Sequence, residues 1–374
     1  MQGLYVHIPF CETKCIYCDF YSVESERTYD AFVDALVKEI HLRADATGDA
    51  GVFTSIFFGG GTPSLLSPSQ LERIVNALVT RFSLSADLEF TAECNPGTVD
   101  REKLSGYRSL GVNRLSFGVQ SFHEDDLKFL SRIHSVADAG KAVDAAHGAG
   151  FGNVNIDLMF SLPGQTPARW MHNLERAREL ETTHISCYSL TVEKGTPLAV
   201  LVDKKLVDLP GEDSDAGLFD TTMETLESWG FRQYEVSNYA KPGFECRHNL
   251  TYWRHQDYLG FGPSAHGTWK KKRYWNVSSL QAYMDRLSRK EIPAAGGEDL
   301  TPEILRGEYI FLRLRSEGID LGEFRNLFGI DFLCEHAGTL RGYERRGFVT
   351  MSDDRVRLTK RGFLVSDELC AGLM

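Results

Sequence analysis

Hydrophobic and polar positions alternate along the first half of the chain in blocks of two kinds. Short apolar runs, typical of buried strands, alternate with longer segments whose apolar residues recur every three or four positions, as on one face of a helix. Strands are expected at residues 4–8, 53–58, 88–94, 112–120, 154–160 and 184–190. Helices are expected between them at residues 26–46, 67–82, 100–110, 135–149 and 166–180.

This alternation predicts a parallel sheet with helices outside, in the α/β class. Periodicity does not decide between an open doubly wound sheet and a barrel, but both place a site at the carboxyl ends of the strands. Polar or special residues fall at these strand ends: Cys11, Gly60, Thr62, Glu93, Asn95 and Gln120, while Asp157 lies within the fifth strand. We expect them to converge on one mouth.

The pattern weakens after residue 195. A further helix is expected at 214–229, and residues 234–276 are rich in aromatics, glycine and histidine. Helices at 303–314, 321–328 and 332–344, followed by a hairpin at 347–358, predict a small helical, winged-helix-like C-terminal domain. The expected organisation is a barrel over 1–195, a barrel-completing region over 196–295 and the small domain over 296–374. The mixed charge of that domain favours a structural lid over a DNA reader.

The composition of the chain argues against several classes of function. Hydrophobic residues make up 42% and charged residues 25% of the chain, as in ordinary globular proteins. A net charge of −11 argues against nucleic-acid binding, and the basic run at 270–273 is interpreted as a hairpin tip. No apolar run approaches the ~20 residues of a membrane span, so no integral membrane segment is expected. Eight cysteines without a disulfide pattern or a secretory signal indicate the cytoplasm.

Cys11, Cys15 and Cys18 form a cluster within the first twenty residues, whereas the other cysteines are scattered singly. Three thiolates on one loop can hold a metal centre from one side and leave a position open for a ligand. A structural zinc site would need a fourth ligand such as His7 or Asp19. A disulfide and three unrelated buried thiols are both less favoured, and an iron–sulfur cluster is the favoured interpretation.

The spacing Cys-x-x-x-Cys-x-x-Cys, with Tyr17 before the third cysteine, resembles the signature of radical S-adenosylmethionine (SAM) enzymes. The resemblance implies a partial (β/α)6 TIM-like barrel and a [4Fe-4S] cluster. In that family three thiolates, here Cys11, Cys15 and Cys18, bind three irons, and SAM chelates the fourth. An electron from the cluster then cleaves SAM to a deoxyadenosyl radical.

The strand-end strings resemble one branch closely, the oxygen-independent coproporphyrinogen III oxidase family. The run from Tyr5 to Cys11 matches the segment before the cluster, and Gly59-Gly60-Gly61-Thr62-Pro63 is similar to the segment that binds the SAM amino group. The resemblance implies SAM contacts at Tyr5, Tyr17, Gly60, Gly61, Thr62, Glu93, Gln120, Arg132 and Asp157. From the residues alone, Arg132 can pair with a carboxylate and a buried Asp157 needs a partner, while Glu93 can equally be a capping or salt-bridged group.

Two departures separate the chain from the oxidases of that family. Phe20 stands where the oxidase has a further cysteine, and the oxidase has a longer segment before the cluster. Conversely, His248-Asn249-Leu250-Thr251-Tyr252-Trp253 resembles the His-Asn-x-x-Tyr-Trp signature of the family's heme chaperones. A histidine among aromatics can ligate heme iron while the rings pack on the macrocycle.

The resemblance therefore makes His248, Tyr252, Trp253 and His266 candidate heme contacts. His266 and Cys246 are alternative iron ligands to His248. Without the resemblance, His248 and Tyr252 would be interpreted as residues that support the fold.

The expected function is that of a cytoplasmic heme chaperone, monomeric or dimeric, which delivers heme to an acceptor such as a respiratory membrane enzyme. The rival is an enzyme of porphyrin biosynthesis that decarboxylates coproporphyrinogen III by radical chemistry. Radical SAM methyl transfer is less favoured, because nothing in the sequence indicates a methyl-accepting residue. No catalytic residue can be named from the sequence.

Overall fold

The computed structural model describes residues 1–24 and 28–374. Six parallel strands run through the first half of the chain: β1 Gly3–Ile8, β2 Val52–Gly60, β3 Ser83–Cys94, β4 Arg114–Gln120, β5 Val154–Phe160 and β6 His184–Ser189. They lie side by side in this order within one sheet, so every strand expected in this half is confirmed.

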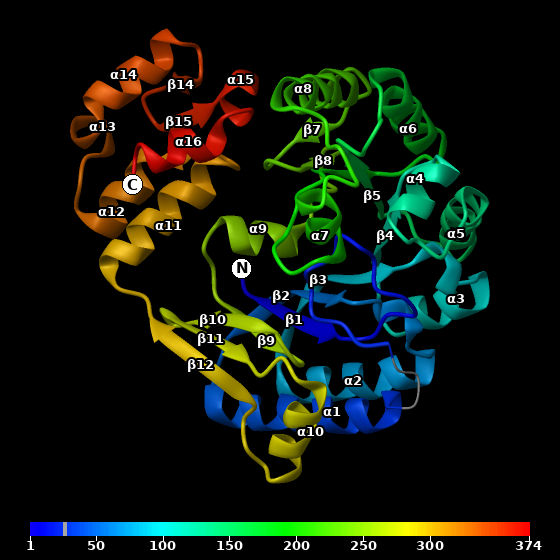
Figure 1. Ribbon diagram of the computed structural model, residues 1–374. Coiled ribbons are helices and arrows are strands. Elements are labelled where there is room, and N and C mark those ends of the chain that lie inside the picture. Colours follow the sequence, from blue (N-terminus) through cyan, green and yellow to red (C-terminus); the bar gives the residue numbers. More distant parts are fainter. Residues whose placement is uncertain (25–27) are drawn as a thin grey trace.

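The expected helices of this half form an outer layer around these strands, as Figure 1 shows. They are α1 Tyr29–Thr47, α2 Pro68–Arg81, α3 Arg101–Ser109, α5 Val136–Gly148 and α6 Pro167–Glu179. Local signals fix their starts: Ser67 and Gln70 form a capping box ahead of α2, and Ser135 and Asp138 form another ahead of α5. The predicted start of the first helix at Glu26 lies outside the described residues. The short helix α4 Glu124–Phe129 was not expected.

The sheet continues beyond both ends of this parallel core. β9 Tyr258–Phe261 pairs in parallel with β1, and β10 His266–Trp269, β11 Lys272–Asn276 and β12 Ala294–Asp299 follow as antiparallel neighbours. At the other edge, β8 Asn238–Ala240 and β7 Arg232–Gln233 follow β6. The order runs from β12 at one edge to β7 at the other without closing, which is a partial barrel. The basic run at 270–273 begins at the turn between β10 and β11, so its interpretation as a hairpin tip is confirmed.

Four helices complete this part of the chain: α7 Pro197–Asp203, α8 Glu212–Ser228, α9 Arg247–Trp253 and α10 Leu280–Ser288. One hydrophobic core extends from Leu4 in β1 to Leu287 in α10. The segment 196–295 therefore shares the core of the six parallel strands. Of the described helices, none is long and apolar enough to cross a membrane.

The C-terminal segment builds a second, separate core from residues between Tyr309 and Leu373. Its elements are α11 Pro302–Leu314, β13 Ile319–Asp320, α12 Leu321–Phe328, α13 Phe332–Glu335, α14 Ala337–Arg345, β14 Val349–Met351, β15 Arg355–Leu358, α15 Lys360–Phe363 and α16 Ser366–Ala371. The expected helix at 332–344 is interrupted at His336, whose backbone leaves the helical region. The expected hairpin is confirmed, with β13 added as a third strand.

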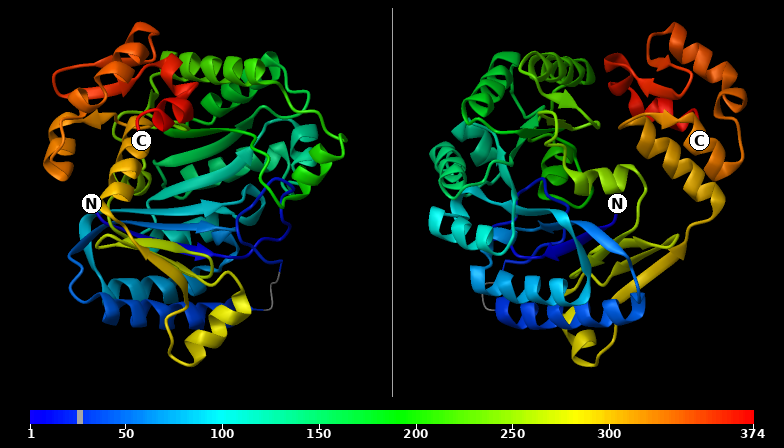
Figure 2. Two further views of the ribbon diagram at one scale, coloured as in Figure 1. Left: turned by 60° about the vertical axis from the view of Figure 1, so that its left-hand side comes forward. Right: turned by 180° about the vertical axis from the view of Figure 1, so that it is seen from behind.

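This C-terminal segment lies beside the open side of the sheet (Figure 2). Glu308 of α11 pairs with Arg273 of β11, and Glu317 makes two hydrogen bonds to the guanidinium of Arg254, which follows α9. Lys360 of α15 pairs with Glu227 of α8, near the other edge. The small domain is therefore tied to elements on both sides of the opening.

Candidate cofactor site

A cavity of about 490 Å³ opens where the carboxyl ends of the parallel strands meet. Its lining includes all the predicted cluster and SAM residues except Tyr5: Cys11, Cys15, Tyr17, Cys18, Gly60, Gly61, Thr62, Glu93, Gln120, Arg132 and Asp157. The expected convergence of the strand ends on one mouth is thus observed, with Asn95 also among the lining residues.

The cysteine loop after β1 is anchored at both of its ends. On one side the backbone of Cys11 donates a hydrogen bond to the carbonyl of Val23 at 3.1 Å, and Val23 donates to Pro9 at 2.7 Å. On the other, Leu198 of α7 donates to the carbonyl of Ile16 at 2.9 Å. Ile16 and Tyr17 pack on a small apolar cluster contributed by α4, β5 and the segments that follow β5 and β6. The three thiols are therefore presented by a braced loop.

The thiols face donors from other strand ends. Arg132 donates to Sγ of Cys15 at 3.3 Å, and the Thr62 hydroxyl donates to Sγ of Cys11 at 3.6 Å. Burial raises the pKa of Cys18 to about 11, because desolvation disfavours the thiolate more than the nearby charge of Lys14 favours it. Among the described residues, no three His, Cys, Asp or Glu side chains converge tightly enough to hold a single metal ion. A cluster does not require such convergence, since each of its irons takes one thiolate.

The glycine run at the end of β2 is required by close packing. Gly60 has φ of +109°, and a Cβ atom there would lie 2.5 Å from the ring of His7. A Cβ atom on Gly61 would lie 2.5 Å from the carbonyl oxygen of Phe10. With no side chains in the way, the backbone of β2 reaches the cavity, where the N–H of Gly60 donates to Glu93 at 3.2 Å.

Two partly buried carboxylates, those of Glu93 and Asp157, line the cavity. Burial, followed by the neighbouring charge of Asp157, raises the pKa of Glu93 to about 8. The pKa of Asp157 is also raised by burial, against hydrogen bonds from Ser186 and Asn155 that favour its ionised form. Neither carboxylate has a Lys or Arg within ion-pair distance among the described residues. A cationic or hydroxyl-bearing ligand would complete this arrangement.

Arg132 is held in place by groups around it and keeps one donor free. Its guanidinium donates to the side chain of Asn95 at 2.9 Å and to the carbonyl of Gly118 at 2.6 Å. His134 bonds the same Asn95 oxygen at 3.1 Å, and burial lowers the pKa of His134 to about 4, so it is neutral at physiological pH. The buried Nε of Arg132 has no partner among the described groups.

Gln120 ends β4 in a conformation that side chains seldom adopt. Its φ is +69°, and the register with β5 shifts between Gly118 and Gln120. Such a conformation costs on the order of 1 kcal/mol, and it occurs often at ligand sites. The bulge keeps Gln120 among the residues that line the cavity.

Tyr5 lies below the cavity and connects it to the predicted heme motif. Its hydroxyl is 3.1 Å from Nδ1 of His7, and its ring stacks with that of His248, with centroids 6.4 Å apart. Burial first, and then the charge of Glu93, raise the pKa of Tyr5. Tyr5 is therefore a neighbour of the predicted SAM contacts rather than part of the cavity lining.

His248 is fully buried in α9, and both of its ring nitrogens are engaged. Nδ1 lies 2.9 Å from the hydroxyl of Ser55 and Nε2 lies 2.8 Å from that of Tyr252. Burial lowers the pKa of His248 to about 3. In this conformation neither nitrogen is open to an iron atom, so heme ligation by His248 stays a prediction that requires α9 to move.

The other predicted heme contacts occupy different places. Tyr252 lines a second cavity, of about 340 Å³, between the sheet and α11. Trp253 lies beneath the guanidinium of Arg315 in the C-terminal domain. His266 is exposed on β10, and Cys246 is fully buried with its thiol 3.5 Å from Glu89. The structure thus brings the SAM candidates together and spreads the heme candidates along the border between barrel and C-terminal domain.

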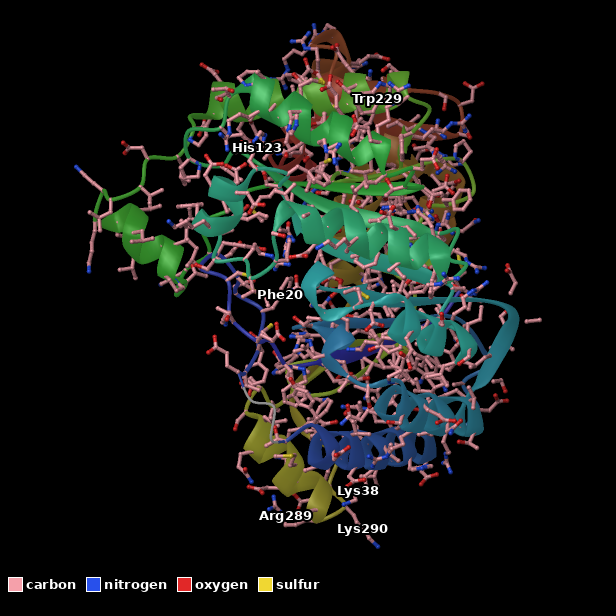
Figure 3. All side chains as sticks on the ribbon, turned by 90° about the vertical axis from the view of Figure 1, so that its right-hand side faces the viewer. Phe20, Lys38, His123, Trp229, Arg289 and Lys290 are labelled. Carbon is pink, nitrogen blue, oxygen red and sulfur yellow. The ribbon has the colours of Figure 1, made fainter. Side chains whose placement is uncertain are left out.

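Sequence reasoning missed an apolar part of the main cavity. Met159, Tyr188 and Leu190 line it, and Phe20 and Ile133 stand at its exposed rim. Figure 3 labels Phe20 beside the N-terminal loop on the face turned to the viewer. Tyr188 and Leu190 could have been found because they lie at the carboxyl end of β6, where the other parallel strands also contribute residues to the cavity. No pattern in the sequence near Ile133 indicates that it belongs to the cavity.

Known proteins resemble the chain in both of its parts. Residues 5–177 match the radical SAM superfamily and residues 300–365 match the HemN C-terminal domain. The heme chaperone HemW of Bacillus subtilis is 38% identical over 99% of this chain and 98% of its own length. HemW of Escherichia coli is 42% identical over 71% of this chain and 69% of its own, and HemW of Lactococcus lactis is 34% identical over 97% and 94%.

A solved structure has the same fold over the whole chain. It is the coproporphyrinogen III oxidase HemN of Escherichia coli, described as a radical SAM enzyme, with a TM-score of 0.85. The match covers 100% of this chain and 89% of that one, at 23% sequence identity.

Proposed function

The chain belongs to the HemW heme chaperone family within the radical SAM superfamily, and from this membership we propose that it binds heme and transfers it to an acceptor protein. The observation that carries the proposal is the end-to-end similarity to HemW of Bacillus subtilis, which includes the C-terminal domain. Phe20, in place of the additional cysteine of the oxidases, supports the same choice.

The cofactors of this superfamily, a [4Fe-4S] cluster and SAM, fit the residues of the main cavity. Three thiols on a braced loop leave one position of a cluster open, and we propose Cys11, Cys15 and Cys18 as the cluster ligands. SAM carries a cationic sulfonium, a cationic amine, a carboxylate and ribose hydroxyls. The carboxylates of Glu93 and Asp157 and the guanidinium of Arg132, which line the cavity, are complementary to these groups.

Individual side chains would hold SAM as follows. Glu93 and Asp157 would accept hydrogen bonds from its amino or hydroxyl groups, while the backbone of Gly60, Gly61 and Thr62 lies close enough to receive its polar end. Arg132 and Gln120 would face its carboxylate end, and Tyr17 would close the cavity beside the cysteines. Held by the three thiolates, a reduced cluster would supply one electron to SAM bound beside it.

We further propose that the chain acts in the cytoplasm and that its acceptor is a heme-requiring enzyme such as a respiratory membrane complex. Heme contact is proposed for the border region that carries Tyr252, Trp253 and His266, with His248 behind it. We propose 296–374 as the small domain, because its core is separate from that of residues 1–295.

The rival function is oxidative decarboxylation of coproporphyrinogen III, and the motivation for it is the SAM-type cavity, which both functions would use. The two functions differ in what is consumed. An oxidase releases 5′-deoxyadenosine in proportion to decarboxylated porphyrinogen, whereas a chaperone returns its heme unchanged. Stoichiometric 5′-deoxyadenosine and product from added coproporphyrinogen III would favour the oxidase.

The chaperone function is tested by binding and transfer together. Anaerobically reconstituted protein is titrated with hemin, and the loaded protein is then mixed with an apo heme protein while the Soret band is followed. We expect saturable binding and a transfer rate above that of free hemin. Absence of saturable binding would remove the chaperone proposal.

The cluster ligands are tested by iron content. Cys18→Ser should lose most of the bound iron and sulfide after reconstitution, because each thiolate holds one iron. Cys334→Ser, which changes an exposed cysteine in the C-terminal domain, is the matched control and should retain both. Equal iron content in the two variants would exclude Cys18 as a ligand.

A further inference from the structure

An axial heme ligand needs an accessible ring nitrogen, and in five of the eleven histidines both ring nitrogens are hydrogen-bonded: His7, His134, His147, His184 and His248. Four more, His123, His172, His255 and His336, have one ring nitrogen in a hydrogen bond or an ion pair. The two without such a bond among the described residues are His41 and His266, and both are exposed. His41 lies on the outer face of α1, away from any aromatic partner described in the structure.

His266 has surroundings that suit a macrocycle. It stands opposite Trp275 in the β10–β11 pairing, and the two rings stack with centroids 6.0 Å apart. The pKa of His266 is lowered by partial burial and by the nearby charge of Arg273, so its imidazole is neutral at physiological pH. A neutral imidazole is the form that ligates iron.

Glycines flank this pair on the neighbouring strands. The neighbouring position beyond Trp275 is Gly296, where a Cβ atom would lie 2.6 Å from the indole. On the other side, a Cβ atom on Gly260 would lie 1.8 Å from the backbone oxygen of His266. Four adjacent strands at about 4.8 Å spacing span about 14 Å, which is on the order of the width of a porphyrin ring.

The same face continues into the second cavity. Tyr258, Thr268 and Arg273, which share a face with His266 and Trp275 through the strand pairing, line that cavity together with Tyr252. The ring of Tyr252 packs edge-on against that of Tyr258, with centroids 4.7 Å apart. The aromatic residue of the His-Asn-x-x-Tyr-Trp motif therefore belongs to the surface that His266 occupies.

We propose, resting on the heme chaperone function above, that His266 is the axial ligand of the bound heme and that the macrocycle lies across Trp275 and the glycine-flanked face of β9–β12. In this arrangement His248 does not touch the iron. It positions Tyr252 through the bond to its hydroxyl and thereby shapes the adjoining cavity.

The test compares four proteins in anaerobic hemin titrations: wild type, His266→Ala, His41→Ala and His248→Ala. Affinity, Soret position and the spin state of the iron are recorded. For His266→Ala we expect a loss of roughly ten- to a hundredfold in hemin affinity, at least the order seen when a group supporting a metal ligand is removed. We also expect a shifted Soret band that added imidazole moves back. His41→Ala should match wild type.

A second readout, the fluorescence of Trp275, does not depend on which residue ligates the heme iron. Hemin bound beside Trp275 quenches its fluorescence, so the quenched fraction should fall in Trp275→Phe while the Soret band stays in place. Circular dichroism checks that each variant folds.

Two results would overturn the assignment. If His266→Ala binds hemin with the affinity and spectrum of wild type, His266 is not the ligand. If His248→Ala alone changes the spin state, the iron is bound by His248. In both cases wild type still binds hemin and the chaperone function stands, whereas no saturable binding by wild type would remove both proposals.

Discussion

Glu93 shows at the scale of one residue how the cavity is prepared for a ligand. Its pKa is raised first by burial and then by the charge of a second carboxylate, Asp157, and it accepts a hydrogen bond from the N–H of Gly60. Without a bound ligand this placement is unfavourable for the ionised form. The placement of Glu93 therefore lowers the stability of the cofactor-free protein, and the proposed contact with SAM would restore that stability.

The cost of ionising Glu93 predicts a pH dependence of stability in protein free of cofactors. Its pKa rises from 4.5 in the unfolded chain to about 8 in the folded protein, so between these values the folded state holds the extra proton. The contribution of Glu93 is fully present below pH 4.5 and is lost as pH rises through 8. Glu93→Gln should remove this loss, which amounts to a few kcal/mol at about 1.4 kcal/mol per pKa unit.

The measurement is urea unfolding at pH 5.5 and pH 8.5. Relative to wild type, Glu93→Gln should gain stability at pH 8.5 and little at pH 5.5. Glu72→Gln, an exposed change on α2, is the control and should follow wild type at both values. Parallel curves for wild type and Glu93→Gln would show that Glu93 is not held in its protonated form.

At the scale of residues, the sequence predicts where a functional side chain lies along the chain better than it predicts which groups that side chain contacts. Residues such as Gln120 and Glu93 were found because a strand end marks a position along the chain, and strand ends follow from local periodicity. The state of His248 was not predictable, because its bond to Ser55 joins residues 193 positions apart. No local pattern shows whether such a histidine is satisfied or open.

At the scale of elements, the added strands β9–β12 depend on one buried carboxylate in α1. Glu39 accepts hydrogen bonds from Arg43 at 2.7 Å, from Asn276 at 2.7 Å and from the N–H of Gly262 at 2.7 Å. The Tyr283 hydroxyl of α10 donates to it at 2.6 Å. Glu39 thus joins α1 to the end of β9, the end of β11 and α10.

These strands were not expected from the sequence for a related reason. They are short, contain glycine, and lack the alternation of a half-buried strand, so their periodicity is weak. Their position is set instead by tertiary bonds such as Glu39 to Asn276, across 237 positions. The six parallel strands were predictable because most of their length consists of short apolar runs that are buried in the core.

Glu39→Gln should therefore destabilise the protein by about 3 kcal/mol, because it leaves the buried guanidinium of Arg43 without a counter-charge. Hydrogen exchange should report the loss chiefly in β9–β12 and α10. Asp34→Asn, which removes an exposed partner of Arg73, is the matched control and should cost less than about 1 kcal/mol. Equal effects of the two changes would contradict the bracing role of Glu39. The same variant should weaken hemin binding if the face of β9–β12 carries the heme.

At the scale of the whole molecule, the chain has two cores joined by a limited contact. The barrel core extends to Leu287 and the C-terminal core begins at Tyr309. Between them lie partly exposed ion pairs such as Arg254 with Glu317, and a few apolar contacts through Phe363 and Leu364. Exposed ion pairs contribute at most about 1 kcal/mol each, so the two parts should be only weakly coupled.

Phe324 tests this weak coupling, because it lies at the centre of the C-terminal core. It is fully buried, and its ring contacts those of Phe328 and Phe332 with centroids 4.8 and 4.9 Å away. Phe324→Ala should cost about 3–5 kcal/mol through lost burial and a remaining cavity. Hydrogen exchange should lose protection in residues 300–374 while β1–β6 keep theirs. Phe117→Ala in β4 is the matched change in the other core and should produce the reverse pattern.

The outcome also decides how the C-terminal domain acts on the proposed heme face. If the C-terminal core loosens alone, the second cavity loses the wall that Glu308 and Leu312 of α11 provide. The cysteine loop remains packed against β5 and α7. Phe324→Ala should then accelerate the release of hemin and leave the iron and sulfide content unchanged. Loss of both together would mean that the two cores unfold as one unit, and the C-terminal domain would then be part of the barrel's stability rather than a lid over the heme.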